Sequence, residues 1–74
     1  MKNKTKLDVF GRIVLAIRKN DVWEVFYLGS DGKRRPAVDI LIPHFVDETE
    51  IERYLSDLCH EWATEKNPLV RRLD

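Results

Sequence analysis

The most reactive side chains of this sequence form the trio Cys59-His60-Glu61, within a stretch whose apolar residues recur at helical spacing. A cysteine beside a histidine is a combination used in nucleophilic catalysis and in metal binding. Adjacent side chains of a helix point about 100° apart, so Cys59 and His60 cannot share a ligand or act as a nucleophile and its base. We therefore expect Cys59 to be a small core hydrophobe and His60 to be solvated.

His44 is the other candidate for chemistry, in a loop after Pro43. No nucleophile, second base or glycine-rich motif accompanies it, and His44, Cys59 and His60 lack the paired close spacings of a structural zinc site. The sequence predicts no catalytic residue, no metal and no cofactor, and therefore a non-enzymatic protein. An enzyme would need a site shared between two chains and built on His44 or Cys59.

One amphipathic helix is expected to position these residues, over Asp47–Lys66. Apolar residues at spacings of 4, 7 and 11 form a single stripe, made of Ile51, Leu55, Leu58 and Trp62. Asp47 and Glu50 stand at the positions of a capping box, with Val46 placed for a hydrophobic staple. Pro68 disfavours helical geometry at the preceding residue, so the helix should end near Lys66.

Three strands are expected before the helix. Leu7–Lys19 has apolar odd positions and a glycine, Gly11, that suggests a bulge. Val22–Leu28 and Ala37–Ile42 follow, and the intervening Asn20-Asp21 and Asp31-Gly32 are typical of turns.

The predicted fold class is α+β, a three-stranded antiparallel β-meander packed on one C-terminal helix in the order β-β-β-α. Residues 7–66 form the single domain, after a disordered basic N-terminus over residues 1–6. Residues 67–74 form a C-terminal tail that could dock on the sheet through Leu69, Val70 and Leu73, with Arg71 and Arg72 in solvent.

The register of the first hairpin stays open at this point. A two-residue loop places Leu15 opposite Phe26 and Val14 opposite Tyr27. A three-residue loop instead places Ile17, Leu15 and Ile13 opposite Trp23, Val25 and Tyr27. The choice matters because a shift of one residue exchanges the two faces of the sheet.

Both faces of this hairpin carry large apolar side chains in either register, and one helix covers only one face. An uncovered apolar sheet face usually marks a binding surface. The sequence therefore predicts a protein-interaction module, either a homodimer or a subunit or regulator of a larger assembly. The predicted partner-binding residues are Trp23, Val25, Tyr27 and Val14.

Charge suggests an alternative partner. The net charge is zero, but residues 1–35 hold nine Lys or Arg and four Asp or Glu, and residues 36–74 hold the reverse. The simplest explanation is that basic loops lie near an acidic helix face. The alternative is a nucleic-acid-binding protein that uses the basic hairpin loop Lys33, Arg34 and Arg35 together with Arg12 and Arg18, which would bind more weakly as salt rises.

The single cysteine excludes an internal disulfide, and no apolar segment follows the basic N-terminus as it would in a signal peptide. The longest apolar run, Ile13–Ile17, is too short to cross a bilayer. The expected location is cytoplasmic, with no membrane partner.

Several segments resemble one known family. They are Asp8–Arg12, Phe26–Gly29 with Asp31–Pro36, Ile42-Pro43, Tyr54–Asp57 and His60–Ala63. The sequence resembles a family of short, uncharacterised bacterial proteins that consist of a domain of unknown function. The resemblance implies a small stand-alone bacterial domain, and it implies no activity, cofactor or catalytic residue.

Overall fold

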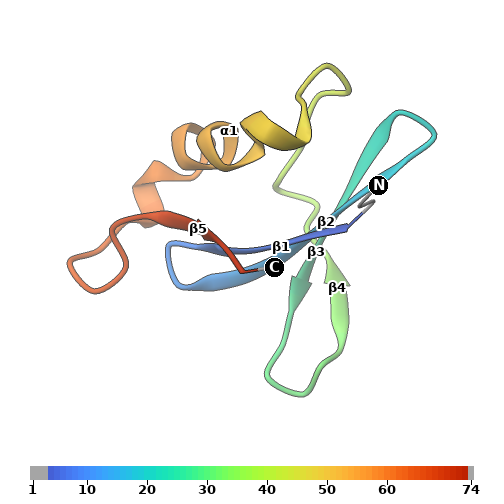
Figure 1. Cartoon of the computed structure of the whole chain (residues 1–74). Coiled ribbons are helices and arrows are strands. Elements are labelled where there is room, and N and C mark those ends of the chain that lie inside the picture. Colours follow the sequence, from blue (N-terminus) through green and yellow to red (C-terminus); the bar gives the residue numbers. More distant parts are fainter. Residues whose placement is uncertain (1–3, 74) are drawn as a thin grey trace.

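The structure is a computed structural model that describes residues 4–73, with a helix lying over one face of an antiparallel sheet (Figure 1). Its elements are β1 (Lys4–Val9), β2 (Arg12–Lys19), β3 (Val22–Leu28), β4 (Arg34–Pro36), η1 (Glu48–Glu50), α1 (Ile51–Leu58), η2 (His60–Trp62) and β5 (Val70–Arg72). The sheet has five strands in the order β4-β3-β2-β1-β5. The α+β class is confirmed, but the predicted number of strands, three, is wrong.

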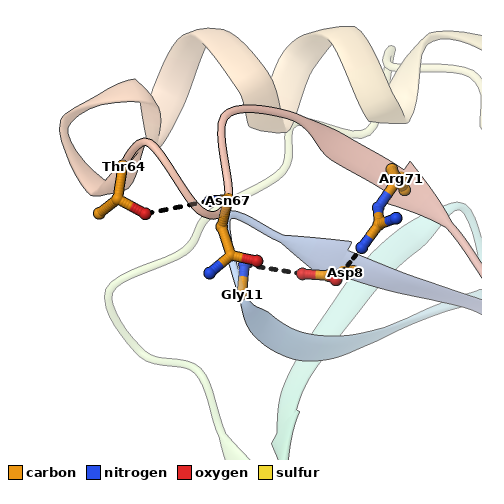
Figure 2. Close-up of polar contacts among 5 residues, drawn as sticks. All are labelled: Asp8, Gly11, Thr64, Asn67 and Arg71. Atoms are coloured by element: carbon orange, nitrogen blue, oxygen red, sulfur yellow. Dashed lines mark hydrogen bonds and ion pairs between the residues drawn. The ribbon is translucent and has the colours of Figure 1, made fainter.

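The segment predicted as one strand over Leu7–Lys19 is a hairpin. Its tight turn holds Phe10 and Gly11 at φ of 51° and 94°, the positive values that a two-residue hairpin loop requires. The Asp8 carboxylate accepts the Gly11 amide hydrogen at 2.7 Å, which fixes the turn (Figure 2). Gly11 is therefore a turn residue and not a bulge. Lys4–Lys6, predicted to be disordered, begin β1, and residues 1–3 lie outside the described part.

The second hairpin settles the register that the sequence left open. Asn20 and Asp21 both have positive φ and form a two-residue loop. Val14 lies opposite Tyr27 and Leu15 opposite Phe26. This is the two-residue alternative, and it decides which side chains share a face.

The strand predicted over Ala37–Ile42 is absent. The edge strand β4 ends at Pro36, and the Ala37 amide makes one more bond, to the Val25 carbonyl at 2.9 Å. The chain then leaves the sheet and rises to the helix (Figure 1). The predicted face of Val38, Ile40 and Ile42 does not exist, since Ile40 and Ile42 are buried but Val38 is 92% exposed. The segment is irregular and packs on the core through Ala37, Ile40 and Ile42.

The helix α1 is shorter than predicted. Only Ile51–Leu58 are α-helical, and single 3-10 turns precede and follow them. The predicted capping box does not form, because the Asp47 side chain makes no cap; its backbone carbonyl instead accepts the Glu50 amide hydrogen at 2.9 Å. The helix ends where Cys59 departs from helical angles and its side chain turns into the core.

The C-terminal tail docks as strand β5 along the edge of β1, with Val70 opposite Val9. Arg72 was expected in solvent, but its guanidinium lies 3.1 Å from the Glu52 carboxylate and donates to the Glu48 carbonyl at 2.6 Å. The tail thereby ties the sheet to the first turns of the helical layer. Leu69 and Leu73, expected to dock, are exposed.

One face of the sheet forms the core under α1. Its fully buried side chains come from β1, β2 and the helix, and are Leu7, Val9, Val14, Ala16, Ile51 and Leu55. The carbonyl oxygen of Val46 accepts hydrogen bonds from the Trp23 indole and the Arg18 guanidinium, each at 2.9 Å. These bonds anchor the segment before the helix on the distal end of β2 and β3.

We predict that Gly11→Ala lowers the free energy of unfolding by more than Gly32→Ala does. Both glycines have positive φ, so both substitutions cost about 1 kcal/mol of backbone strain. A Cβ at Gly11 would also lie 2.8 Å from the Asn67 amide nitrogen, whereas at Gly32 it meets nothing within 4 Å. Urea unfolding measures the free energy of unfolding of both variants. Equal losses would contradict the close packing of Asn67, and Asn67→Ala should reduce the loss at Gly11 only.

Candidate docking face

The face of the sheet opposite α1 carries a continuous apolar centre. We define the open face as the side chains of β1 to β5 that point away from the helix, a side on which no helix of residues 4–73 lies (Figure 1). Strand alternation places Ile13, Leu15 and Ile17 of β2 there, next to Phe26 and Leu28 of β3. All five are half-buried, shielded only by neighbours within the sheet. Val22, at the end of the same face, is 57% exposed.

Charged side chains surround this apolar centre, and most are basic. The basic ones are Lys4, Lys6, Lys19, Arg34 and Arg71, and the acidic ones are Asp8 and Glu24. Asp8 is already engaged, because it binds the Gly11 amide and the Arg71 guanidinium at 3.0 Å (Figure 2). Arg34 lies over the Phe26 ring at 5.7 Å. The open face therefore combines an apolar centre with a net positive border.

The residues predicted to bind a partner lie on the other face. Val14, Trp23 and Val25 are buried under the helical layer, and Tyr27 is half-buried beside them. Trp23 is held there by its bond to the Val46 carbonyl. The structure thus assigns this set to the core, because the helix covers that face.

The five predicted basic-patch residues do not converge. Arg12 and Arg18 lie on the covered side of β2, six residues and therefore about 20 Å apart. Arg12 stacks on the Trp62 ring at 3.9 Å, and Arg18 binds the Val46 carbonyl. Arg34 belongs to the open face, whereas Arg35 lies opposite Tyr27 on the covered side. Nucleic-acid binding stays a prediction for the hairpin of Lys33, Arg34 and Arg35 alone.

A polar cluster closes the end of the core nearest the β3–β4 hairpin. The Tyr27 hydroxyl donates to the Asp39 carboxylate, 2.7 and 2.8 Å from its two oxygens. Desolvation by burial, followed by the hydrogen bond and charge of Asp39, raises the pKa of Tyr27 to about 12, although Arg12 acts in the opposite direction. The Tyr27 and Trp62 rings lie 6.4 Å apart. This network joins the irregular segment before the helix to the sheet, so its role is structural.

The side chains that suggested chemistry are separated. Cys59 is buried, and desolvation raises the pKa of its thiol above the ordinary value, so the thiol stays protonated at neutral pH. His60 is exposed, and His44 is exposed with its ring 5.7 Å from the Phe45 ring. Within residues 4–73, no group of three His, Cys, Asp or Glu side chains is placed to hold a metal ion. In the same range, no helix is long and apolar enough to cross a membrane.

Fold and surface together define a small α+β domain with one covered and one open sheet face. The chain belongs to the family described as a domain of unknown function, DUF7661, which matches residues 4–74. The predicted family resemblance is therefore confirmed, while the bacterial origin stays a prediction. Comparisons with curated proteins and with solved structures found no match.

We predict that deprotonation of Tyr27 lowers the stability of the folded protein in alkaline solution. Its folded pKa of about 12 lies above the ordinary value of 10.0, so its contribution is complete below pH 10 and is lost as pH rises through 12. In a Tyr54→Phe background Tyr27 is the only tyrosine, and ultraviolet titration reports it alone. Asp39→Asn should move the titration toward 10. No movement would contradict the assigned role of Asp39.

Proposed function

We propose that this protein is a non-enzymatic protein-interaction module that docks another protein chain on the open face of its sheet. One observation carries the proposal. Five strands present two apolar faces, and the eight-residue helix α1, with its flanking 3-10 turns, lies on only one of them. An apolar sheet face left without a covering layer is a common feature of interaction surfaces.

The composition of the open face supports protein docking. Aliphatic and aromatic side chains form its centre, with Leu15 in the middle of β2 and Phe26 opposite it on β3. Charged groups stand at the border, as in protein interfaces with an apolar core and a polar rim. Neither edge of the sheet offers a comparable surface, since β4 and β5 are three residues long and β4 ends in proline.

Another group of exposed apolar side chains lies on the helix side, but it is less continuous. Leu41 and Phe45 are 78% and 74% exposed. Phe45 borders an open hollow of about 240 Å³ whose other walls include Glu50, Arg53 and Asp57. The charges interrupt the apolar surface there, so we assign docking to the sheet.

We predict that Leu15→Lys abolishes retention of the partner. A lysine at this half-buried position keeps an aliphatic stem over its neighbours and brings a charge into the centre of the docking face. The tagged protein is purified from its native host with nuclease present and with a differently tagged second copy co-expressed. Mass spectrometry then compares the bound chains. The wild type should retain a partner chain in near-stoichiometric amount, and Leu15→Lys should lose it.

The matched control is Leu41→Lys, the same substitution at an exposed position on the helix side. It should retain the partner at the wild-type ratio. Circular dichroism and a thermal melt establish that both variants are folded. The proposal fails if Leu15→Lys retains the same chain as the wild type, or if the wild type retains neither another protein nor its second copy.

A further inference from the structure

Cations outnumber carboxylates at both ends of the open face. The charged side chains are Lys4, Lys19 and Glu24 at the end nearest the β2–β3 turn, and Arg34, Arg71 and Asp8 at the opposite end. Arg71 is neutralised by Asp8, whereas Lys4, Lys19 and Arg34 form no ion pair with another residue of the described range 4–73. Lys6, between the two ends, is engaged within the chain. The border therefore keeps a positive charge at each end that the fold does not neutralise.

The apolar centre is a narrow strip on two adjacent strands. Its members are Ile13, Leu15 and Ile17 on β2 and Phe26 and Leu28 on β3. The strands on either side, β1 and β4, present only charged residues and a proline on this face. Strands about 4.8 Å apart, with a rise of about 3.3 Å per residue, make the strip about 10 Å wide and about 13 Å long. An α-helix is about 10 Å across and rises about 1.5 Å per residue, so one helix of about nine residues covers the strip.

We infer that the occupant of the open face is an amphipathic α-helix of another protein, with acidic residues on both sides of its apolar stripe. The inference rests on the docking function proposed above and names the chemistry of its partner. The apolar stripe covers the side chains of β2 and β3, and the flanking carboxylates meet Lys4, Lys19 and Arg34 at the border.

A second copy of this chain fits the face less well. Packing two open faces about a two-fold axis parallel to β2 brings Arg71 opposite Arg34 and places Lys19 on its own copy. A second sheet of any origin would also cover β1, and would remove the charges of Lys4 and Asp8 from water. Buried charges without partners of opposite sign are costly, so the border favours a narrow and acidic partner.

The side chains of the centre favour a protein helix over nucleic acid or a bilayer. Single-stranded nucleic acid stacks its bases on several aromatic rings, and this centre has one, Phe26. The five apolar side chains are half-buried, while Lys4, Lys19 and Arg34 are exposed and longer. A helix can lie between these long side chains, whereas a flat bilayer meets them before it reaches the centre.

Two synthetic peptides test the inference. Each has about 14 residues and is held helical by a hydrocarbon staple on its outer side, because so short a helix is marginal in water. Both carry the same leucine stripe at helical spacing. One has glutamates on both sides of the stripe and the other has lysines. Titration into the isotopically labelled full chain, followed by NMR, gives each dissociation constant and the amides that respond.

The glutamate peptide should bind roughly tenfold more tightly than the lysine peptide in low salt, and the difference should shrink as salt rises. The responding amides should belong to β2 and β3, around Leu15 and Phe26. The contact is small, so both dissociation constants should be those of a weak and transient complex.

Reversal of the border should reverse this preference. The variant Lys4→Glu/Lys19→Glu/Arg34→Glu replaces the three cations that lack an ion pair, so it should bind the lysine peptide more tightly than the glutamate peptide.

The control variant is Arg35→Glu/Arg53→Glu/Lys66→Glu. It changes the net charge equally at exposed positions outside the open face, on the covered side of β4, on α1 and after η2. It should keep the preference of the wild type. Circular dichroism and thermal melts establish that both triple variants are folded.

The outcomes separate this inference from the proposed function. Equal binding of the two peptides, binding of neither, or a response on the helix side overturns the acidic helix as occupant. Self-association of the wild type through Leu15, or tighter binding to phosphatidylglycerol vesicles than to the glutamate peptide, also overturns it. The proposed function stands if Leu15→Lys loses the retained chain, whatever the peptides do, and it fails if that variant keeps the chain.

Discussion

The carbonyl oxygen of Val46 determines which face of the sheet is covered. It accepts two hydrogen bonds, from the Trp23 indole and the Arg18 guanidinium, and the Val46 side chain is itself buried. A carbonyl has two lone pairs, and both are used here by donors from neighbouring strands. The helix that follows is therefore held over the side of the sheet that carries Val14, Ala16 and Val25. The opposite side becomes the open face as a direct consequence.

The rest of the chain supports this one-sided arrangement from the two sheet edges. At one edge, Arg72 of β5 contacts Glu48 and Glu52 and so ties the sheet to the helical layer. At the other, Tyr27 binds Asp39 and holds the segment that crosses from β4 to the helix. Both contacts hold the helical layer and the segment before it against the same face of the sheet. Arg72, Glu48 and Glu52 all belong to the acidic second half of the chain, so this ion-pair cluster does not join the basic half to the acidic half.

The open face keeps apolar side chains that the helical layer does not cover. A domain of this size buries only about 60% of the surface of its unfolded chain, and here the helical layer is a single eight-residue helix with short turns. Leu15 and Phe26 lie side by side on the face that no helix of residues 4–73 covers. The short edge strands and Pro36 disfavour the addition of another strand at either edge of the sheet.

The sequence by itself determined the local features, because they depend on neighbours along the chain. The α+β class, the second strand Val22–Leu28 and the turn at Asn20-Asp21 could all be predicted from periodicity and turn chemistry. So could the buried, inert character expected of Cys59. Of the predicted helical stripe, Ile51 and Leu55 are buried as expected, whereas Leu58 is exposed and Trp62 lies in a 3-10 turn after the helix.

Only the tertiary structure decided the rest. Gly11 was compatible with a bulge or a turn, and its φ of 94° beside Phe10 made it a turn that splits one predicted strand into two. The alternation at Ala37–Ile42 indicated a strand, yet Pro36 ends the ladder and the segment packs on the core instead. Above all, the periodicity of the hairpin shows that both faces are apolar but not which one the helix covers. That choice is made by long-range contacts such as Trp23 to Val46, which no local pattern encodes.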